Sequence, residues 1–403
     1  MNFLNPVIGL EKDLAAQIYD ALQGDIVKFI LNNAKETSED EFWRSRMEGH
    51  CMKADKNLLG NFYKLCHEVK DRLGFKEPVD FYVTGDSTIN AYSIAAEDKD
   101  HPHMVNVNSE LFNLMSEDEL RFVIGHELGH LINQDTVLKR LIYFVYPPSI
   151  SNIPVTLQYK IHLHDNLAEL VADRYGYLAC QNLNACVTAF FKMASGLDLE
   201  KMQVSIEDLL SDNSKRLDYF LKGGGMSHYD HPVNPIRVQA INLFANAKSQ
   251  EELNTEMEEL IQILLKVGNN PLDEPMSAFI ATAGLITAGI DGQITREEYE
   301  HIIQNLASSK IFPKDYLSKI GTMDVAKLFE EAINAILTIN PGLKPNLLEY
   351  IISVVMSDKE IGENEVNFVY DIGHSLGLSI KEISIIFAGQ IQRNFNPSLD
   401  AIS

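Results

Sequence analysis

Cysteine and long apolar runs are both scarce in this sequence. The 403 residues include four cysteines and no Cys-x-x-Cys pair. That pattern excludes a disulfide-dense scaffold and favours free thiols in a reducing compartment. No apolar run reaches the roughly 20 residues that a membrane-spanning helix needs. The first residues also lack the basic and apolar segments of a signal peptide. We therefore expect a soluble, cytoplasmic protein without a membrane span.

Positive charge is scarce too. The 34 basic side chains are outnumbered by 57 acidic ones, for a net charge of −23. A chain this acidic is a poor partner for nucleic acid or anionic lipid, because it has little charge with which to neutralise phosphates. The acidity is uneven, since residues 250–403 hold 23 acidic and only 10 basic side chains. That asymmetry indicates a separate C-terminal module.

One apolar stretch carries a His-Glu-x-x-His pattern. His126 and His130 are four residues apart, so on a helix they share a face and can reach one metal ion, while Glu127 can reach a water on that metal. A helix is predicted independently over about residues 117–134, because Ser116 and Glu119 form a capping-box pattern. Two buried histidines on a core helix are the alternative.

A second predicted helix carries Glu169 and Asp173, which share a face one turn apart. A catalytic zinc ion needs three protein ligands and an open position for water. Glu169 is our candidate third ligand. Asp173 is the candidate partner for the free ring N–H of a ligating histidine, whose tautomer it would fix. The spacing leaves the two roles interchangeable, and a surface carboxylate pair is the alternative.

Three short strands are predicted over residues 79–84, 90–94 and 104–108. The last lies just ahead of the motif helix, where we expect an exposed sheet edge that binds a peptide by strand addition. An ordinary small sheet packed on the helix is the alternative. The candidate substrate-binding residues are Asn90, Ala91, Val105 and Val107.

A glycine-rich loop leads into His231-Pro232, and Arg237 follows on the next predicted helix. Histidine and arginine side chains near a flexible loop can stabilise a transition state. An ordinary loop is the alternative.

Taken in order, these stretches resemble the HtpX-like and CAAX-prenyl-endopeptidase-like family of zinc metallopeptidases, which are gluzincins, over about residues 81–245. The pieces that carry the resemblance are Asn90-Ala91, His126-Glu127-Leu128-Gly129-His130, Glu169-Leu170-Val171-Ala172-Asp173, and His231-Pro232 with Arg237. The resemblance implies that His126, His130 and Glu169 bind one zinc ion. It also implies that Glu127 is the general base, that Asp173 orients a ligand, that His231 stabilises the oxyanion or occludes the zinc, and that Arg237 supports the site.

Two departures from the family limit what the resemblance implies. Many members have a membrane hairpin between the first two motifs, whereas here that linker is short and broken by prolines. The segment after Asn90-Ala91 holds a charged insert at residues 97–100. Because of the first departure we do not carry over the membrane-protein or prenylated substrates of relatives, and because of the second we do not carry over the register of a bound substrate.

The C-terminal module contains an internal repeat with an offset of 67 residues, in which Asp291 aligns with Asp358. Its Asp-x-x-Ile-x-x-x-Glu pattern resembles TerB-like all-helical domains over about residues 270–392. An EF-hand is excluded because Thr287 and Gly289 would occupy its first and third ligand positions, where carboxylate ligands are expected. Helix capping explains the aspartates, and metal binding by Asp291 or Asp358 stays open. We expect an interaction or regulatory domain.

These observations predict an α+β, mainly helical protein with a zincin-type catalytic domain: a small sheet with an edge strand, and the motif helix. We expect a helical segment at 1–75, the catalytic domain at 76–249 and an acidic all-helical domain at 250–403. The predicted activity is zinc-dependent endopeptidase cleavage of protein or peptide substrates. The alternative is a catalytically silent, zinc-binding chaperone-like or regulatory protein that works through its C-terminal domain. An aminopeptidase is disfavoured because no Gly-x-Met-Glu-Asn motif occurs.

Overall fold

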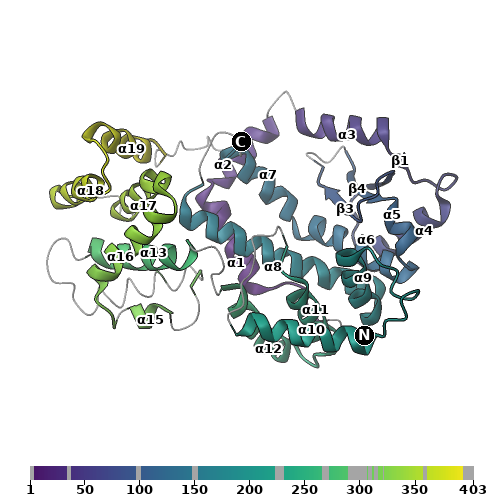
Figure 1. Ribbon diagram of the computed structural model, residues 1–403. Coiled ribbons are helices and arrows are strands. Elements are labelled where there is room, and N and C mark those ends of the chain that lie inside the picture. The colour runs from purple at the N-terminus through teal and green to yellow at the C-terminus, as the bar shows by residue number, and fades with distance from the viewer. Residues whose placement is uncertain are drawn as a thin grey trace. The chain divides into compact units, whose positions relative to one another are not determined.

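The structure is a computed structural model (Figure 1). It describes residues 4–33, 38–96, 101–147, 153–222, 231–265, 272–288, 306, 311–312, 316–320, 322–356 and 361–393. The chain forms two compact units. The first takes in most of the chain up to Leu264, and the second contains residues 153–160 and the chain from Leu265 onward. The predicted α+β, mainly helical fold is confirmed.

The first unit holds a small sheet and most of the helices. Its helices are α1 (Gly9–Ala21), α2 (Gly24–Asn33), α3 (Ser38–His50), α4 (Gly60–Arg72), α5 (Glu110–Leu114), α6 (Glu117–Asn133), α7 (Asp135–Val145), α8 (Val155–Cys180, whose first turns belong to the second unit), α9 (Leu183–Ser195), α10 (Ile206–Leu221), α11 (Asn234–Asn246) and α12 (Gln250–Leu265). Its strands are β1 (Met52–Lys53), β2 (Val79–Thr84), β3 (Ala91–Ile94) and β4 (His103–Asn108).

The sheet has the strand order β1-β2-β4-β3, with β2 and β4 parallel and the outer pairs antiparallel. The prediction that residues 104–108 form the exposed edge is wrong. β4 pairs with β2 on one side and β3 on the other, and Val105 and Val107 are fully buried. They contact the main core on one face, while Met104 packs with Met47 of α3 on the other. A strand covered on both faces and paired on both sides has no free backbone for a substrate, so the edges among the described strands are β1 and β3, of which β3 is the one beside β4.

The helix α6 lies against β3 and β4 (Figure 1) and shares its core with α4 and α9. Its contact with α8 is unusually close because glycines face each other. A Cβ on Gly125 would lie 2.4 Å from the Cβ of Ala179, and one on Gly129 would lie 2.9 Å from the Cβ of Tyr175. Gly176 of α8 faces Phe122 in the same way. This close approach lets short side chains on α6 and α8 converge.

The described part of the second unit is helical. It contains α13 (Asp273–Ala288), α15 (Tyr316–Ile320), α16 (Val325–Ile339), a 3-10 turn at Pro341–Leu343, α17 (Lys344–Val355), α18 (Glu363–Ser375) and α19 (Ile380–Arg393). Leu285 and Ile352, which the internal repeat aligns, are both buried in its core. Asp291 and Asp358 lie outside the described residues, as does the charged insert at residues 97–100. The TerB-like assignment and the domain boundaries stay predictions.

No helix in the described ranges is long and apolar enough to cross a membrane.

Candidate metal centre

The motif helix α6 begins with the capping box that the sequence predicts. The Ser116 side chain accepts a hydrogen bond from the Glu119 backbone N–H, and the Glu119 carboxylate accepts one from the Ser116 backbone at 2.6 Å. Glu119 is buried and also accepts hydrogen bonds from Lys192 and Thr188 of α9. The start of α6 is therefore fixed to a neighbouring helix, which sets the orientation of the motif.

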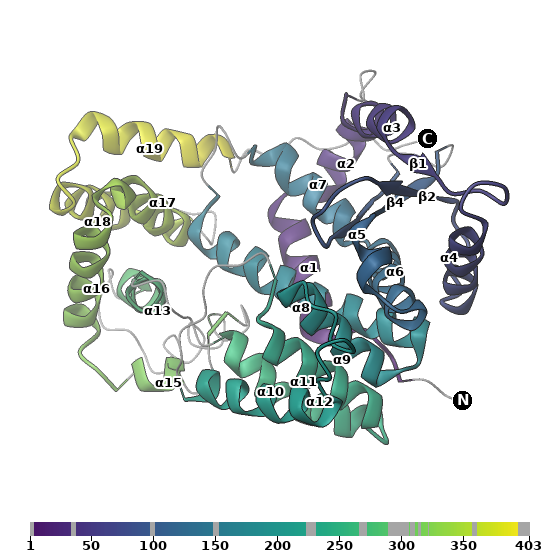
Figure 2. The ribbon, with the colours of Figure 1, turned by 45° about the vertical axis from the view of Figure 1, so that its right-hand side comes forward.

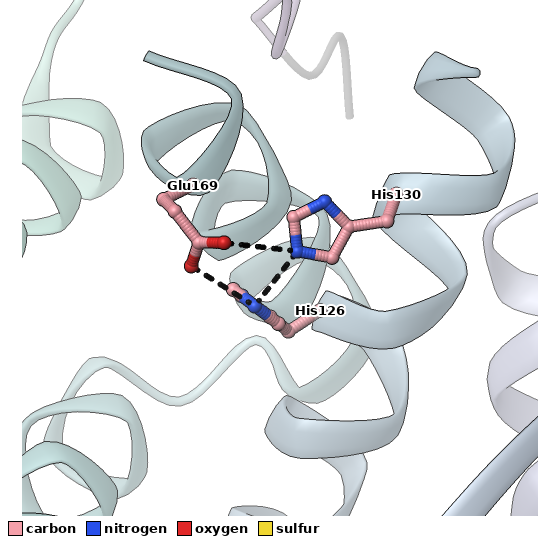
Figure 3. A group of neighbouring side chains, drawn as sticks. All are labelled: His126, His130 and Glu169. Atoms are coloured by element: carbon pink, nitrogen blue, oxygen red, sulfur yellow. Dashed lines mark hydrogen bonds and ion pairs between the residues drawn. The ribbon is translucent and has the colours of Figure 1, made fainter. Parts of the chain in front are cut away.

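His126, His130 and Glu169 converge between α6 and α8 (Figure 3). The two histidine Nε2 atoms are 3.1 Å apart. The carboxylate oxygens of Glu169 lie 3.5 Å from Nε2 of His126 and 3.4 Å from Nε2 of His130. Ligands in a tetrahedral zinc site, with bonds of 2.0–2.2 Å, are about 3.4 Å from one another. The three side chains therefore fit a zinc ion without rearrangement.

The carboxylate of Glu169 keeps a free lone pair at this point. Its Oε2 atom is buried and accepts no hydrogen bond within the described residues, although Arg237 Nη2 lies 3.4 Å away. A buried acceptor without a donor is costly unless something else binds it. A metal ion between Glu169 and the two histidines would satisfy that atom.

Asp173 lies behind His126, away from the metal position. Its Oδ1 accepts a hydrogen bond from His126 Nδ1 at 2.9 Å. Arg237 of α11 binds the same carboxylate with two hydrogen bonds, at 2.8 Å from Nε and 2.6 Å from Nη2. The Nδ1–H of His126 is thereby fixed, which leaves Nε2 with its lone pair for a metal. Of the two carboxylates whose roles the spacing left interchangeable, Glu169 faces the Nε2 atoms and Asp173 faces Nδ1.

Asp135 accepts a hydrogen bond from His130, as Asp173 does from His126. The sequence analysis did not predict this role for Asp135. His130 donates its Nδ1–H to Asp135 Oδ2 at 3.1 Å. The chain turns sharply at Gln134, whose φ of 66° ends α6, so Asp135 begins α7 close to His130. An aspartate one turn beyond the second histidine was the signal that could have identified it.

Charge at the site keeps its groups ionised. Burial alone would raise the pKa of Glu169, but His130, His126 and Arg237 hold it well below its usual range. Burial also opposes ionisation of Asp173, yet Arg237 and His126 lower its pKa overall. For His130, burial lowers the pKa, but Glu169 and Asp135 outweigh it and raise the pKa well above its usual value. Without a metal, the carboxylates around His130 thus favour its protonated form.

The other predicted site residues differ in how far they are buried around His126, His130 and Glu169. Glu127 is buried beside it, and its charge raises the pKa values of His130 and Arg237. Arg237 is buried with its guanidinium over the ring of Phe190. The side chain of His231 is 58% exposed, and its Nδ1 lies 3.7 Å from Glu169 Oε1. Ala91 is the first residue of the edge strand β3, which contacts α6, and Asn90 directly precedes that strand.

Residues 62–166 match the model of peptidase family M48. The plastoglobule-localised metallopeptidase 48 of Arabidopsis thaliana is 26% identical over 218 residues, which cover 51% of this chain and 62% of that protein. The HtpX protease homologue of Thermoplasma volcanium is 36% identical over 86 residues, which cover 21% of this chain and 27% of the relative. An HtpX protease homologue of Trichormus variabilis is 36% identical over 75 residues, or 25% of its length. No solved structure matches the chain significantly.

The chain therefore spans less than two thirds of each of these relatives. The family match includes His126, Glu127 and His130, whereas Glu169, Asp173, His231 and Arg237 lie beyond it. The motif helix inside the match, together with the protease-named relatives, supports a relationship to the HtpX-like metallopeptidases of family M48.

Proposed function

We propose that the chain is a zinc-dependent endopeptidase that cleaves protein or peptide substrates. The observation that carries the proposal is the convergence of His126, His130 and Glu169 at the mutual distances of tetrahedral zinc ligands. One zinc ion per chain, held by these three side chains, leaves a fourth position open. When bound, zinc acts as a Lewis acid that lowers the pKa of water and polarises a carbonyl.

The protein groups around that position have distinct tasks in the proposed reaction. Glu127 takes a proton from the attacking water and passes it to the leaving amine, as a buried carboxylate beside the ligands can. His231, at the exposed side of the triad, donates a hydrogen bond to the oxygen on which negative charge develops. Arg237 and Asp173 hold His126 in the tautomer that binds metal through Nε2.

The substrate segment is expected to pair with β3, the edge strand. Ala91 and Ser93 are aligned with Val107 and Val105, so they lie on the sheet face that joins the core with α6. An extended peptide along this edge would receive main-chain hydrogen bonds from β3 and side-chain specificity from alternate positions. We therefore assign substrate binding to Asn90 and to strand β3, which begins at Ala91, and no longer to Val105 and Val107 of β4.

The alternative is a zinc-binding protein without catalytic activity. Glu127 favours the enzyme, because a binding module has no need for a buried general base beside its metal. We also propose a cytoplasmic location, supported by four free cysteines, and a protein partner for the second unit. The name of the Arabidopsis relative places that protein in the plastoglobules of the chloroplast.

The deciding experiment measures zinc content and casein cleavage for the wild type and for Glu127→Gln. We expect one zinc ion per chain in both proteins and at least a hundredfold lower cleavage in the variant, because loss of a general base typically costs about 10²–10⁴-fold. Glu117→Gln is the matched control, since Glu117 lies on the same helix but is exposed and pairs with Arg121. Equal cleavage by wild type and Glu127→Gln, or no bound zinc after metal-replete purification, would contradict the proposal.

A second measurement separates an endopeptidase from an aminopeptidase. Casein peptides with acetylated N-termini are incubated with the protein, and the products are identified by mass spectrometry. An endopeptidase cuts these blocked peptides at internal bonds. Cleavage confined to peptides with a free N-terminus would instead show the exopeptidase activity that the sequence disfavours.

A further inference from the structure

The first helix, α1, lies outside the residues that match the family, yet it contains some of the most deeply buried side chains in the molecule. Glu11, Leu14 and Ile18 all have 0% exposure. Burying leucine and isoleucine is favourable, whereas burying a carboxylate is costly unless donors surround it. The position of Glu11 therefore calls for a specific set of partners.

Those partners connect Glu11 to a metal ligand. The Glu11 Oε1 atom accepts a hydrogen bond from the Asn133 side-chain amide at 3.2 Å. The same amide nitrogen donates to Asp135 Oδ1 at 2.6 Å. The other oxygen of Asp135 accepts the Nδ1–H of His130. Two side chains thus link a carboxylate of α1 to the second histidine of the motif.

Two separate contacts, one through a side chain and one through the backbone, also hold this segment to the same helices. Lys12 of α1 donates to the backbone carbonyl of Asn133, near the end of α6, at 3.3 Å. Arg174 of α8, which is buried, donates to the backbone carbonyl of Pro6 at 3.0 Å. In both ribbon views α1 lies beside α8 (Figures 1 and 2). The segment is thus fixed next to the metal centre independently of Glu11.

We propose that Glu11 is a positioning residue of the metal centre, which it supports through Asn133, Asp135 and His130. The inference rests on the zinc site proposed above and assigns a role to the N-terminal segment. The two ligating histidines then have equivalent support. Each gives its Nδ1–H to a buried aspartate, and a further buried side chain fixes that aspartate: Arg237 for Asp173, and Asn133 with Glu11 for Asp135.

The same cluster could also suggest a second metal site, since Glu11, Asp135 and His164 have ligand atoms within 4.8 Å of one another. The hydrogen bonds argue against that interpretation. Asn133 points its N–H groups at both carboxylates, and His130 occupies the remaining Asp135 oxygen. His164 supplies the countercharge: burial lowers its pKa, but Asp165 and Glu11 raise it to about 9. Groups of the chain itself therefore bind Glu11 Oε1 and both oxygens of Asp135, while the buried Glu11 Oε2 accepts no hydrogen bond within the described residues and lies 3.9 Å from Lys12 Nζ.

The test measures the zinc dissociation constant of the full-length chain by competition with a chromophoric chelator. We expect Glu11→Ala to weaken zinc binding by about three- to tenfold, below the 10–100-fold typical of a direct partner of a ligating histidine. Glu11→Gln keeps an acceptor oxygen for Asn133 and should recover most of that loss. Leu14→Ala is the structural control. It truncates a buried side chain of the same helix, so it should leave a cavity in the core and lower Tm, but zinc affinity should stay unchanged.

A double-mutant cycle then tests the route. If Glu11 acts through Asn133, adding Glu11→Ala to Asn133→Ala should weaken zinc binding no further. Wild-type affinity in Glu11→Ala, equal weakening by Leu14→Ala, or two zinc ions per wild-type chain would each overturn the inference. Absence of zinc from the wild type is a different result, because it would overturn the proposed function and the inference with it.

Discussion

Arg237 is the residue whose loss should affect the centre most without touching the metal. It is buried, binds Asp173 with two hydrogen bonds and lies 3.4 Å from Glu169. Arg237→Met removes the guanidinium partner of the buried Asp173 carboxylate and leaves it only His126, so we expect a loss of roughly 3–5 kcal/mol in the free energy of unfolding. Urea unfolding of the metal-free protein measures this.

The control for that variant is Arg216→Met. Arg216 also pairs with an aspartate, Asp212, but 64% of its side chain is exposed. Surface pairs contribute roughly 0–1 kcal/mol, so its loss should be small. Similar losses in the two variants would contradict the argument that Arg237 compensates a buried carboxylate.

His130 gives zinc binding a pH dependence of known sign. Its pKa is raised well above the usual value in the metal-free protein, mainly by Glu169 and Asp135 against the effect of burial. Its ion pairs therefore stabilise the metal-free fold fully below about pH 6.5, the unfolded value, and that stabilisation is lost as pH rises through the raised pKa. A metal ligand must be deprotonated at the binding atom, so zinc has to displace a proton.

We therefore expect zinc binding above pH 6.5 to release more protons than it would if the ligand were an unperturbed histidine, which is mostly deprotonated there. Calorimetric titration in buffers of different ionisation enthalpy measures the number of protons. Asp135→Asn removes one carboxylate that raises the pKa, so it should reduce the release. The same proton count in wild type and Asp135→Asn would show that Asp135 does not control the protonation of His130.

At the scale of elements, the glycines of the motif helix set the distance between α6 and α8. A Cβ on Gly125 would lie 2.4 Å from the Cβ of Ala179 and 3.0 Å from the backbone of Gly176. Gly125→Ala should push the helices apart, cost about 1–3 kcal/mol as overpacked cores do, and weaken zinc binding because His126 and Glu169 lie on opposite helices. Tm and zinc affinity measure the two effects.

Gly389→Ala is the matched control for the helix-spacing prediction. Gly389 lies inside α19 with nothing within 4 Å of an added Cβ. Alanine is favoured over glycine in a helix interior by about 1 kcal/mol, so this variant should be slightly more stable and should bind zinc normally. Unchanged stability and zinc affinity in Gly125→Ala would show that α6 and α8 can separate without disturbing the site.

Local signals predicted the motif helix well, because its cap and its apolar spacing are encoded within about 20 residues. Sheet order was harder. The apolar alternation of residues 104–108 fits an interior strand as well as an edge strand, and only the pairing with Val79–Thr84 and Ala91–Ile94 decides between them. The partners of the ligands were predicted where they share a helix with a motif residue, as Asp173 does with Glu169. Glu11 was missed because it comes from a helix more than 100 residues away.

At the scale of the whole molecule, the two compact units have separate cores. The core around α6 and the core of α13 and α17 share no buried residue among those described. Cores that do not interpenetrate usually unfold as separate cooperative units. The proposed zinc ligands all belong to the first unit.

Calorimetry with and without zinc should therefore show two transitions, of which zinc raises only one. A ligand that binds the folded state alone adds about 2.7 kcal/mol at a free concentration of 100 times its Kd, and that increment belongs to the unit containing the site. Glu169→Gln should abolish the shift while leaving the second transition in place. A zinc-dependent shift of both transitions would show that the units unfold together, and the metal centre would then stabilise the whole chain.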